Sequence, residues 1–163
     1  MSIPEGLFNR PVREFMRKKF YVLDGSETVA KAARLMKEKG LGSLGVNLSD
    51  GSLGILTDRD VVYKVVAEGK DPSSLKLEDV ATPHPVSVTM DASLEQAMKL
   101  MRDNNILRLV VVDPDGRPVG LLVERWVFLA LANELLGRPR EGPRGWLEQY
   151  INDVTEAAAH DLF

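Results

Sequence analysis

The sequence predicts an α+β fold in which two copies of a βαββα unit are followed by a C-terminal helix. Short apolar runs of strand length alternate with segments whose apolar residues recur at helical spacing. This order of segments occurs twice, at a shift of about 65 residues. The chain has 163 residues, 44% hydrophobic composition and no Cys, so it can bury a core without disulfides or Cys-ligated zinc.

The first copy covers residues 9–70 and follows an N-terminal arm at 1–8. Ser26 is predicted to cap the longest helix of this copy, which Gly40 ends. A helix starting at Thr57 and ending near Glu68 closes the unit. The other expected elements are a short helix at 12–17 and strands at 20–23, 44–48 and 53–56.

The second copy covers residues 71–136 and repeats the pattern in the same order. The apolar helix face at 94, 97, 98 and 101 corresponds to the face at 29, 32, 33 and 36. Residues 137–163 are predicted to form a linker and an amphipathic helix that begins at Trp146. Two units this small are expected to pack their sheets together about a pseudo-twofold axis, with a cleft between them.

Composition narrows the class of protein. The net charge of -3 and pI near 5.5 argue against a nucleic-acid partner. The chain has neither an apolar run long enough to span a bilayer nor a signal-peptide core at its N-terminus, which predicts a cytoplasmic protein without membrane attachment. Only His84 and His160 are present, and no catalytic triad or Gly-rich phosphate loop occurs, so we expect no metal site and no enzymatic activity.

The stretch from Gly54 to Val62 is the best candidate for a binding site. The hydrophobic period changes from strand to helix at Thr57, which makes Thr57 the expected N-cap. A helix start leaves backbone N–H groups without partners and favours an anion such as phosphate. The alternative is a capping box in which Thr57 and Asp60 satisfy one another without any ligand. The local residues fit both interpretations.

The duplicated pattern resembles the tandem cystathionine-β-synthase (CBS) domain pair, or Bateman module, over residues 9–136. The resemblance rests on the Ala-x-x-x-Met pairs at 32/36 and 97/101, on Leu-Val-Val-Val-Asp at 109–113 and on Gly-Ile-Leu-Thr-Asp-Arg-Asp at 54–60. It implies that Thr57 and Asp60 hold the ribose of an adenine nucleotide. A carboxylate is an acceptor-only group that suits two neighbouring hydroxyls.

The resemblance extends the predicted nucleotide site beyond this pair. Arg59 either contacts phosphate or is a solvated surface charge, and the basic run that includes Lys19 is open to the same two interpretations. In the second copy, Val123 and Trp126 replace the Thr and Asp, which predicts one nucleotide site per chain. The full predicted set is Thr57, Asp58, Arg59, Asp60, Phe20, Tyr21, Val22, Lys19 and Arg108.

The resemblance therefore implies a non-catalytic regulatory module that binds AMP, ADP or ATP in the cleft between the repeats and controls a partner protein. The helix at 126–136 is apolar almost all round and is expected to be buried on more than one side, and the resemblance implies a homodimer formed through it. An S-adenosylmethionine-binding module remains open, as does a ligand-free structural scaffold for protein interaction.

Overall fold

The computed structural model describes residues 6–18 and 20–135, which form two compact units with one sheet each. Residues 21–85 make one unit, called here the 21–85 unit. Residues 6–18, 20 and 86–135 make the other, called the 86–135 unit. The predicted α+β class, with tandem copies of one unit, is confirmed. The predicted C-terminal helix lies outside the described residues.

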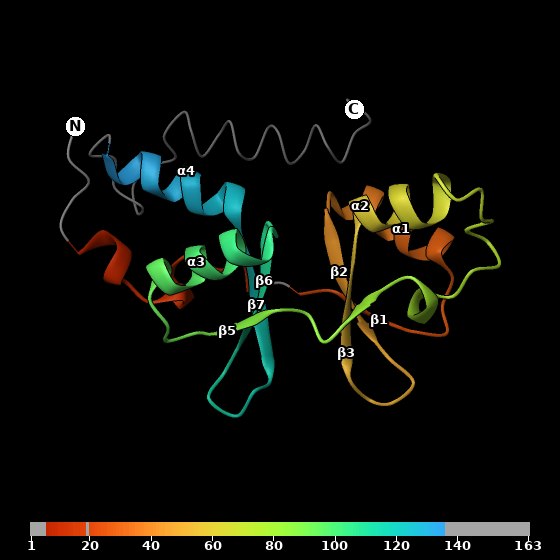
Figure 1. Cartoon of the computed structure of the whole chain (residues 1–163), viewed down its shortest axis with the longest axis horizontal. Helices are drawn as coiled ribbons and strands as arrows, with labels where there is room; N and C mark the ends of the chain where they lie inside the picture. The colour runs from red at the N-terminus through yellow and green to blue at the C-terminus, as the bar shows by residue number, and fades with distance from the viewer. Residues whose placement is uncertain (1–5, 19, 136–163) are drawn as a thin grey trace. The chain divides into compact units, whose positions relative to one another are not determined.

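The 21–85 unit contains a four-stranded sheet in the order β1-β2-β3-β4. Strands β1, β2 and β3 are labelled in Figure 1. β1 pairs with β2 in parallel, and the other two pairings are antiparallel. Its strands are β1 (Val22–Asp24), β2 (Ser43–Asn47), β3 (Leu53–Thr57) and β4 (Thr82–Pro83). Its helical segments are α1 (Val29–Lys39), α2 (Asp58–Asp60), the π-helical segment η3 (Val61–Val66) and the 3-10 turn η4 (Leu77–Asp79).

Helix α1 begins two residues later than predicted. Its N-cap is Thr28, whose hydroxyl accepts a hydrogen bond from the Lys31 N–H, whereas the Ser26 hydroxyl donates to the Asp24 carboxylate in a local turn. The prediction of a Ser26 cap was therefore wrong, because both residues are good caps and Asp24 engages the first of them. The predicted end is confirmed, since Gly40 adopts φ 61° beyond the last turn.

The helix that follows Thr57 differs in form from the regular α-helix expected to reach Glu68. It has one α-helical turn and then continues as the π-helical segment η3, with a left-handed Gly69 (φ 65°) beyond its end. η3 turns Val65 into the core and leaves Val62, Tyr63 and Val66 between 51% and 67% exposed. Such π-helical insertions are frequent at functional sites.

The 86–135 unit repeats this architecture with a sheet in the order β5-β6-β7 (Figure 1). Its strands are β5 (Ser87–Thr89), β6 (Arg108–Val112) and β7 (Pro118–Val123). Its helical segments are α3 (Leu94–Asn104), α4 (Glu124–Leu135) and the 3-10 turns η1 (Leu7–Asn9) and η2 (Val12–Glu14). The segment at 12–17, predicted to be a helix, is thus a single 3-10 turn. Leu7, in the predicted arm, is 4% exposed and belongs to the core.

The two units exchange their first short helices relative to the sequence repeats. η2 precedes the first repeat, yet its Val12 N–H donates to the Ala92 carbonyl, and Arg17 pairs with Leu121 on the edge of β7. Correspondingly, η4 and β4 complete the 21–85 unit, where Thr82 pairs with Ile55. The sequence boundary at residues 70 and 71 describes the duplication of the chain, whereas the compact units divide it near residues 20 and 85.

Candidate functional site

The first corner, residues 57–60, lies where β3 ends and α2 begins. Thr57 is paired across the sheet with Ser43, and Asp58 is the first helical residue. The side chains of Asp58 and Arg59 are exposed, whereas that of Asp60 is only 14% exposed. The change from strand to helix at Thr57, predicted from the hydrophobic period, is confirmed.

Thr57 and Asp60 form a complete capping box. The Thr57 N–H donates to Asp60 Oδ2 over 2.9 Å, and the Asp60 N–H donates to Thr57 Oγ1 over 3.1 Å. The Thr57 hydroxyl also donates its proton to Asp60 Oδ2 over 2.7 Å. The capping box, which the sequence offered as the alternative to a ligand site, is therefore present in the structure. It fixes the side chains of both Thr57 and Asp60, the predicted ribose-binding pair.

Lys64 is a member of this corner that sequence reasoning missed. Its ammonium lies 2.8 Å from Asp60 Oδ1 and donates to the Val80 carbonyl over 3.0 Å and to Thr82 Oγ1 over 3.3 Å. The spacing from Asp60 to Lys64 is the i, i+4 spacing of helical ion pairs, which was the available signal. Lys64 thereby connects the corner to the chain leading into β4.

The first corner keeps hydrogen-bond acceptor positions that the protein itself does not use. A carboxylate offers about four acceptor positions, and Asp60 uses two on Oδ2 and one on Oδ1. The Thr57 hydroxyl has donated its proton and used one of its two acceptor positions. One acceptor position on Asp60 Oδ1 and one on Thr57 Oγ1 remain. The corner is thus suited to a ligand that brings two neighbouring hydroxyl donors.

The other predicted site residues do not all fall in the same unit. Tyr21 precedes β1 and packs against the core of the 21–85 unit, and Val22 is 39% exposed in β1 beside Gly45. Phe20 and Arg108 belong to the 86–135 unit. Lys19 lies outside the described residues. The structure therefore groups Tyr21 and Val22 with the first corner in one compact unit.

The second corner, residues 123–126, occupies the equivalent position between β7 and α4. Val123 stands where Thr57 does and is paired with Arg108 on β6, as Thr57 is paired with Ser43. The guanidinium carbons of Arg17 and Arg125 each lie 5.2 Å from the centre of the Trp126 indole ring. This corner has no hydroxyl–carboxylate pair, and its neighbours are cationic.

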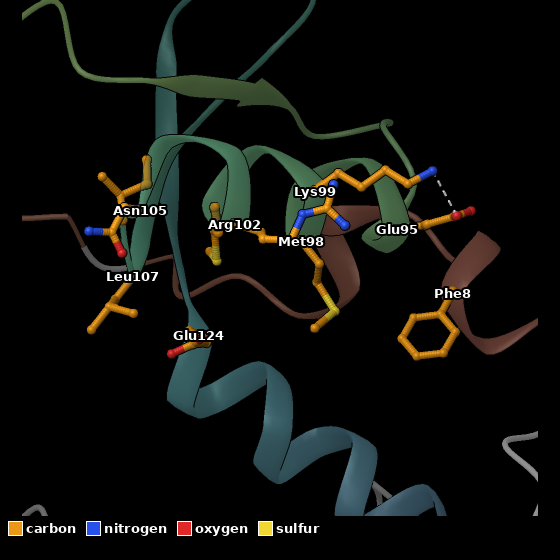
Figure 2. Close-up of a pocket in the computed structure, with 10 residues that line it drawn as sticks. Phe8, Glu95, Met98, Lys99, Arg102, Asn105, Leu107 and Glu124 are labelled. Atoms are coloured by element: carbon orange, nitrogen blue, oxygen red, sulfur yellow. Dashed lines mark ion pairs between the residues drawn. The ribbon is translucent and has the colours of Figure 1, made fainter.

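A separate cavity of about 700 Å³ lies in the 86–135 unit between α3, η1 and the start of α4 (Figure 2). Phe8, Met98 and Leu107 supply apolar wall, and the ion pair between Lys99 and Glu95 lies at the rim. None of the predicted nucleotide-binding residues lines it. The cavity is therefore distinct from the first corner and includes Glu124 of the second.

Two classes of site are absent from the described part of the chain. Over residues 6–18 and 20–135, no group of three or more His, Asp or Glu side chains could hold a metal ion. Within the same residues, no helix is both long enough and apolar enough to cross a bilayer.

Comparison with known proteins gives a consistent family match. The sequence profile of the CBS domain matches residues 12–67 and 77–125, which is more than half of the chain and two tandem copies. The chain is 37% identical to the uncharacterized protein MK0525 of Methanopyrus kandleri over 112 residues, 68% of this chain and 57% of that protein. It also matches 26% of an inosine-5'-monophosphate dehydrogenase from Korarchaeum cryptofilum at 29% identity. The chain thus spans about half or less of several relatives.

Solved structures agree with this match. CBSX2 in complex with AMP is similar with a TM-score of 0.63 at 28% identity, covering 77% of this chain and 98% of that one. A hexameric CBS-CP12 protein from bloom-forming cyanobacteria is similar with a TM-score of 0.69 at 28% identity, covering 93% and 83%. The family therefore includes a protein solved with an adenine nucleotide and a protein that forms an oligomer.

Proposed function

The chain belongs to the CBS domain family as a tandem pair, and we propose that it is a regulatory module that binds an adenine nucleotide through its first corner. The observation that carries this proposal is the pair of acceptor positions left on Asp60 Oδ1 and Thr57 Oγ1. A ribose presents two adjacent hydroxyl donors, and hydrogen bonds to an ionised carboxylate are about twice as strong as neutral ones. AMP bound to the similar CBSX2 supports this ligand class.

The fixed geometry of the corner favours such binding. The capping box and Lys64 hold Asp60 in position before any ligand arrives, so little ordering is needed on binding. The exposed Arg59 lies in the first turn of the same helix and has no carboxylate partner for its guanidinium among the described residues, which leaves the guanidinium available for a phosphate. The inter-repeat cleft expected from the sequence is the proposed location of the base.

The test is isothermal titration of the purified chain with AMP, ADP, ATP and S-adenosylmethionine. We expect one adenylate per chain, and 2'-deoxy-AMP should bind about tenfold more weakly, since it lacks one hydroxyl donor to a charged acceptor. Asp60→Ala should abolish the binding of AMP, whereas Asp115→Ala, which removes an exposed carboxylate of the β6–β7 turn, should leave AMP binding unchanged. The absence of heat with all four ligands would contradict the proposal.

A second function, a ligand-free interaction scaffold, has its own supporting observation. The capping box is complete without a ligand, and η3 leaves three large apolar side chains exposed. Under this function, Asp60→Ala removes only a cap and costs roughly 0.5–2 kcal/mol of stability. Because the loss of the cap is expected under both functions, titration of this variant with ligand is the measurement that separates them.

The proposed regulation also involves other chains. We expect a homodimer formed through the exposed apolar residues of η3 and through Phe128 on α4, which is 53% exposed. The site is proposed to act without catalysis, in the cytoplasm, on a client protein. Regulation requires that the nucleotide bind two conformations with different affinity, which measurement of its effect on the dimer would test.

A further inference from the structure

The second corner differs from the first in charge as well as in shape. At the first corner, Thr57, Asp58 and Asp60 supply acceptor oxygens beside Ser43. At the second corner, Trp126 stands in place of Asp60 and Arg108 in place of Ser43. Arg17, which lies in the N-terminal segment paired with the edge of β7, adds a further cation. The second corner thus lacks the acceptors of Thr57 and Asp60, keeps a carboxylate (Glu124) and an Arg (Arg125) at the positions of Asp58 and Arg59, and has Arg108 and Arg17 as additional cations.

Trp126 orients two of these cations. Arg17 and Arg125 both lie 5.2 Å from the centre of its ring, within the range of cation–π attraction. Because they share one ring, their guanidinium carbons are at most about 10 Å apart. The indole therefore contacts both guanidinium groups, although like charges repel.

The backbone fixes the Arg17 side of this cluster independently. The Arg17 N–H donates to the Leu121 carbonyl over 2.8 Å, and the Leu121 N–H donates to the Arg17 carbonyl over 3.0 Å. This approach needs Gly120, because a Cβ there would lie 2.5 Å from the Arg17 carbonyl oxygen. Arg17 is thus anchored to β7 in a two-bond bridge.

Neither guanidinium is neutralised within the described part of the chain. No carboxylate among residues 6–18 and 20–135 lies within 4.0 Å of Arg17 or Arg125. Glu124, the acidic residue next to Arg125, lines the separate cavity between α3 and α4 (Figure 2). The cluster therefore has exposed cationic donors and unmet charge.

We propose that Arg17, Arg125 and Trp126 form an anion site for the polyphosphate group of a nucleotide or of an inorganic polyphosphate. A guanidinium fork can bind two oxygens of one phosphoryl group, so two forks in contact with one indole suit a chain of linked phosphoryl groups better than they suit a single carboxylate. Trp126 supplies no acceptor for the ribose hydroxyls, so the site should recognise the negative charge of the phosphoryl groups and not the nucleoside. The inference is independent of the proposed ribose-binding role of Asp60.

Trp126 provides its own probe. The chain has two Trp, so Trp146→Phe leaves Trp126 as the only indole. Titration of this protein with inorganic triphosphate at low salt should give a saturable change in fluorescence. Arg17→Gln and Arg125→Gln should each weaken binding by about tenfold or more, as expected for a lost charge-assisted contact. Arg34→Gln, which removes an exposed cation from α1, is the matched control and should have no effect.

Three further measurements keep this test independent of the nucleotide proposal. Calorimetric titration of the unmodified chain with triphosphate should give the same affinity, which guards against damage by Trp146→Phe. In Asp60→Ala, ATP and triphosphate should still bind equally through the second corner. The proposal is overturned if triphosphate causes no fluorescence change and no heat, if Asp60→Ala abolishes triphosphate binding, or if Arg34→Gln weakens binding as much as Arg17→Gln. Stronger binding of a single-stranded oligonucleotide than of triphosphate would also overturn it.

Discussion

Replacing Gly120 with Ala should detach the N-terminal segment from the edge of β7. The added Cβ would lie 2.5 Å from the Arg17 carbonyl oxygen and 3.2 Å from the Met16 sulfur. The sulfur ends a flexible side chain and can move, but the carbonyl belongs to backbone that is itself bonded to Leu121. Gly120 does not occupy the left-handed region, so the cost comes from lack of space. Either β7 or the Arg17 backbone must shift.

The expected cost is about 1–3 kcal/mol of unfolding free energy, the usual range for overpacking a well-filled site. The cost approaches the upper end of that range if the two hydrogen bonds between Arg17 and Leu121 open, since each contributes roughly 0.5–1.5 kcal/mol. Leu7, Val12 and Phe15, which lie in the same N-terminal segment, are core residues of the 86–135 unit. Loosening the segment should therefore lower the stability of this unit.

Urea unfolding followed by circular dichroism measures this cost, and Gly54→Ala is the matched control. Gly54 holds the equivalent position in β3, but a Cβ there would meet its nearest neighbours, Leu48 Cδ2, Ala81 Cβ and the Thr82 carbonyl oxygen, at 3.2–3.3 Å. Small adjustments relieve such contacts, so we expect less than about 1 kcal/mol. Gly120→Ala should also change Trp126 fluorescence, because it displaces Arg17 from the indole. Equal urea midpoints for the two variants, with unchanged Trp126 emission, would refute the reasoning.

Four further outcomes follow from the contacts described above. Thr28→Ala should lower stability by about 1 kcal/mol in urea unfolding, because it removes the cap of α1. Lys64→Met should cost no more than about 1 kcal/mol in the same assay, since its ammonium pairs with Asp60 while 44% exposed. The Ser26 hydroxyl and N–H lower the pKa of the Asp24 carboxyl below its ordinary 3.8, so Ser26→Ala should reduce stability at neutral pH. That reduction should shrink as the pH falls below 3.8, which urea midpoints across pH would show. Tyr63→Ser should leave stability within about 0.5 kcal/mol while shifting sedimentation from dimer to monomer, because Tyr63 is 63% exposed.

Hydrophobic period was sufficient to predict the order of the regular elements. The strands that end at Asn47 and Thr57, and the helix that Gly40 ends, are buried on one or both faces, so their apolar residues recur with a readable spacing. Thr57 was predictable as a cap because the period changes at that residue. The cap of α1 was not, because Ser26 and Thr28 are chemically equivalent candidates and only the turn at Asp24 distinguishes them.

Contacts between segments far apart in the chain could not be predicted from the sequence pattern. η2 and η4 are single 3-10 turns, which are too short to show a period, so nothing indicated that each completes the unit of the other repeat. The stacking of Arg17 on Trp126 joins residues far apart in the chain through this exchange. The sequence alone showed that Trp126 replaces the carboxylate found at Asp60 in the first repeat. That Arg17 lies on the Trp126 ring could be seen only in the folded structure.

The two units make the same structural link with different partners for a cation. In each unit, a cationic side chain links the helix that follows the corner to a short segment at the edge of the sheet, and this segment comes from the other sequence repeat. In the 21–85 unit, Lys64 reaches from the helix to the Val80 carbonyl and the Thr82 hydroxyl. In the 86–135 unit, Arg17 reaches from the edge segment to Trp126 on α4. The link at the second corner involves no carboxylate, whereas Lys64 at the first corner also pairs with Asp60. Because the two links share no residue, we expect substitutions at one corner to leave ligand affinity at the other unchanged.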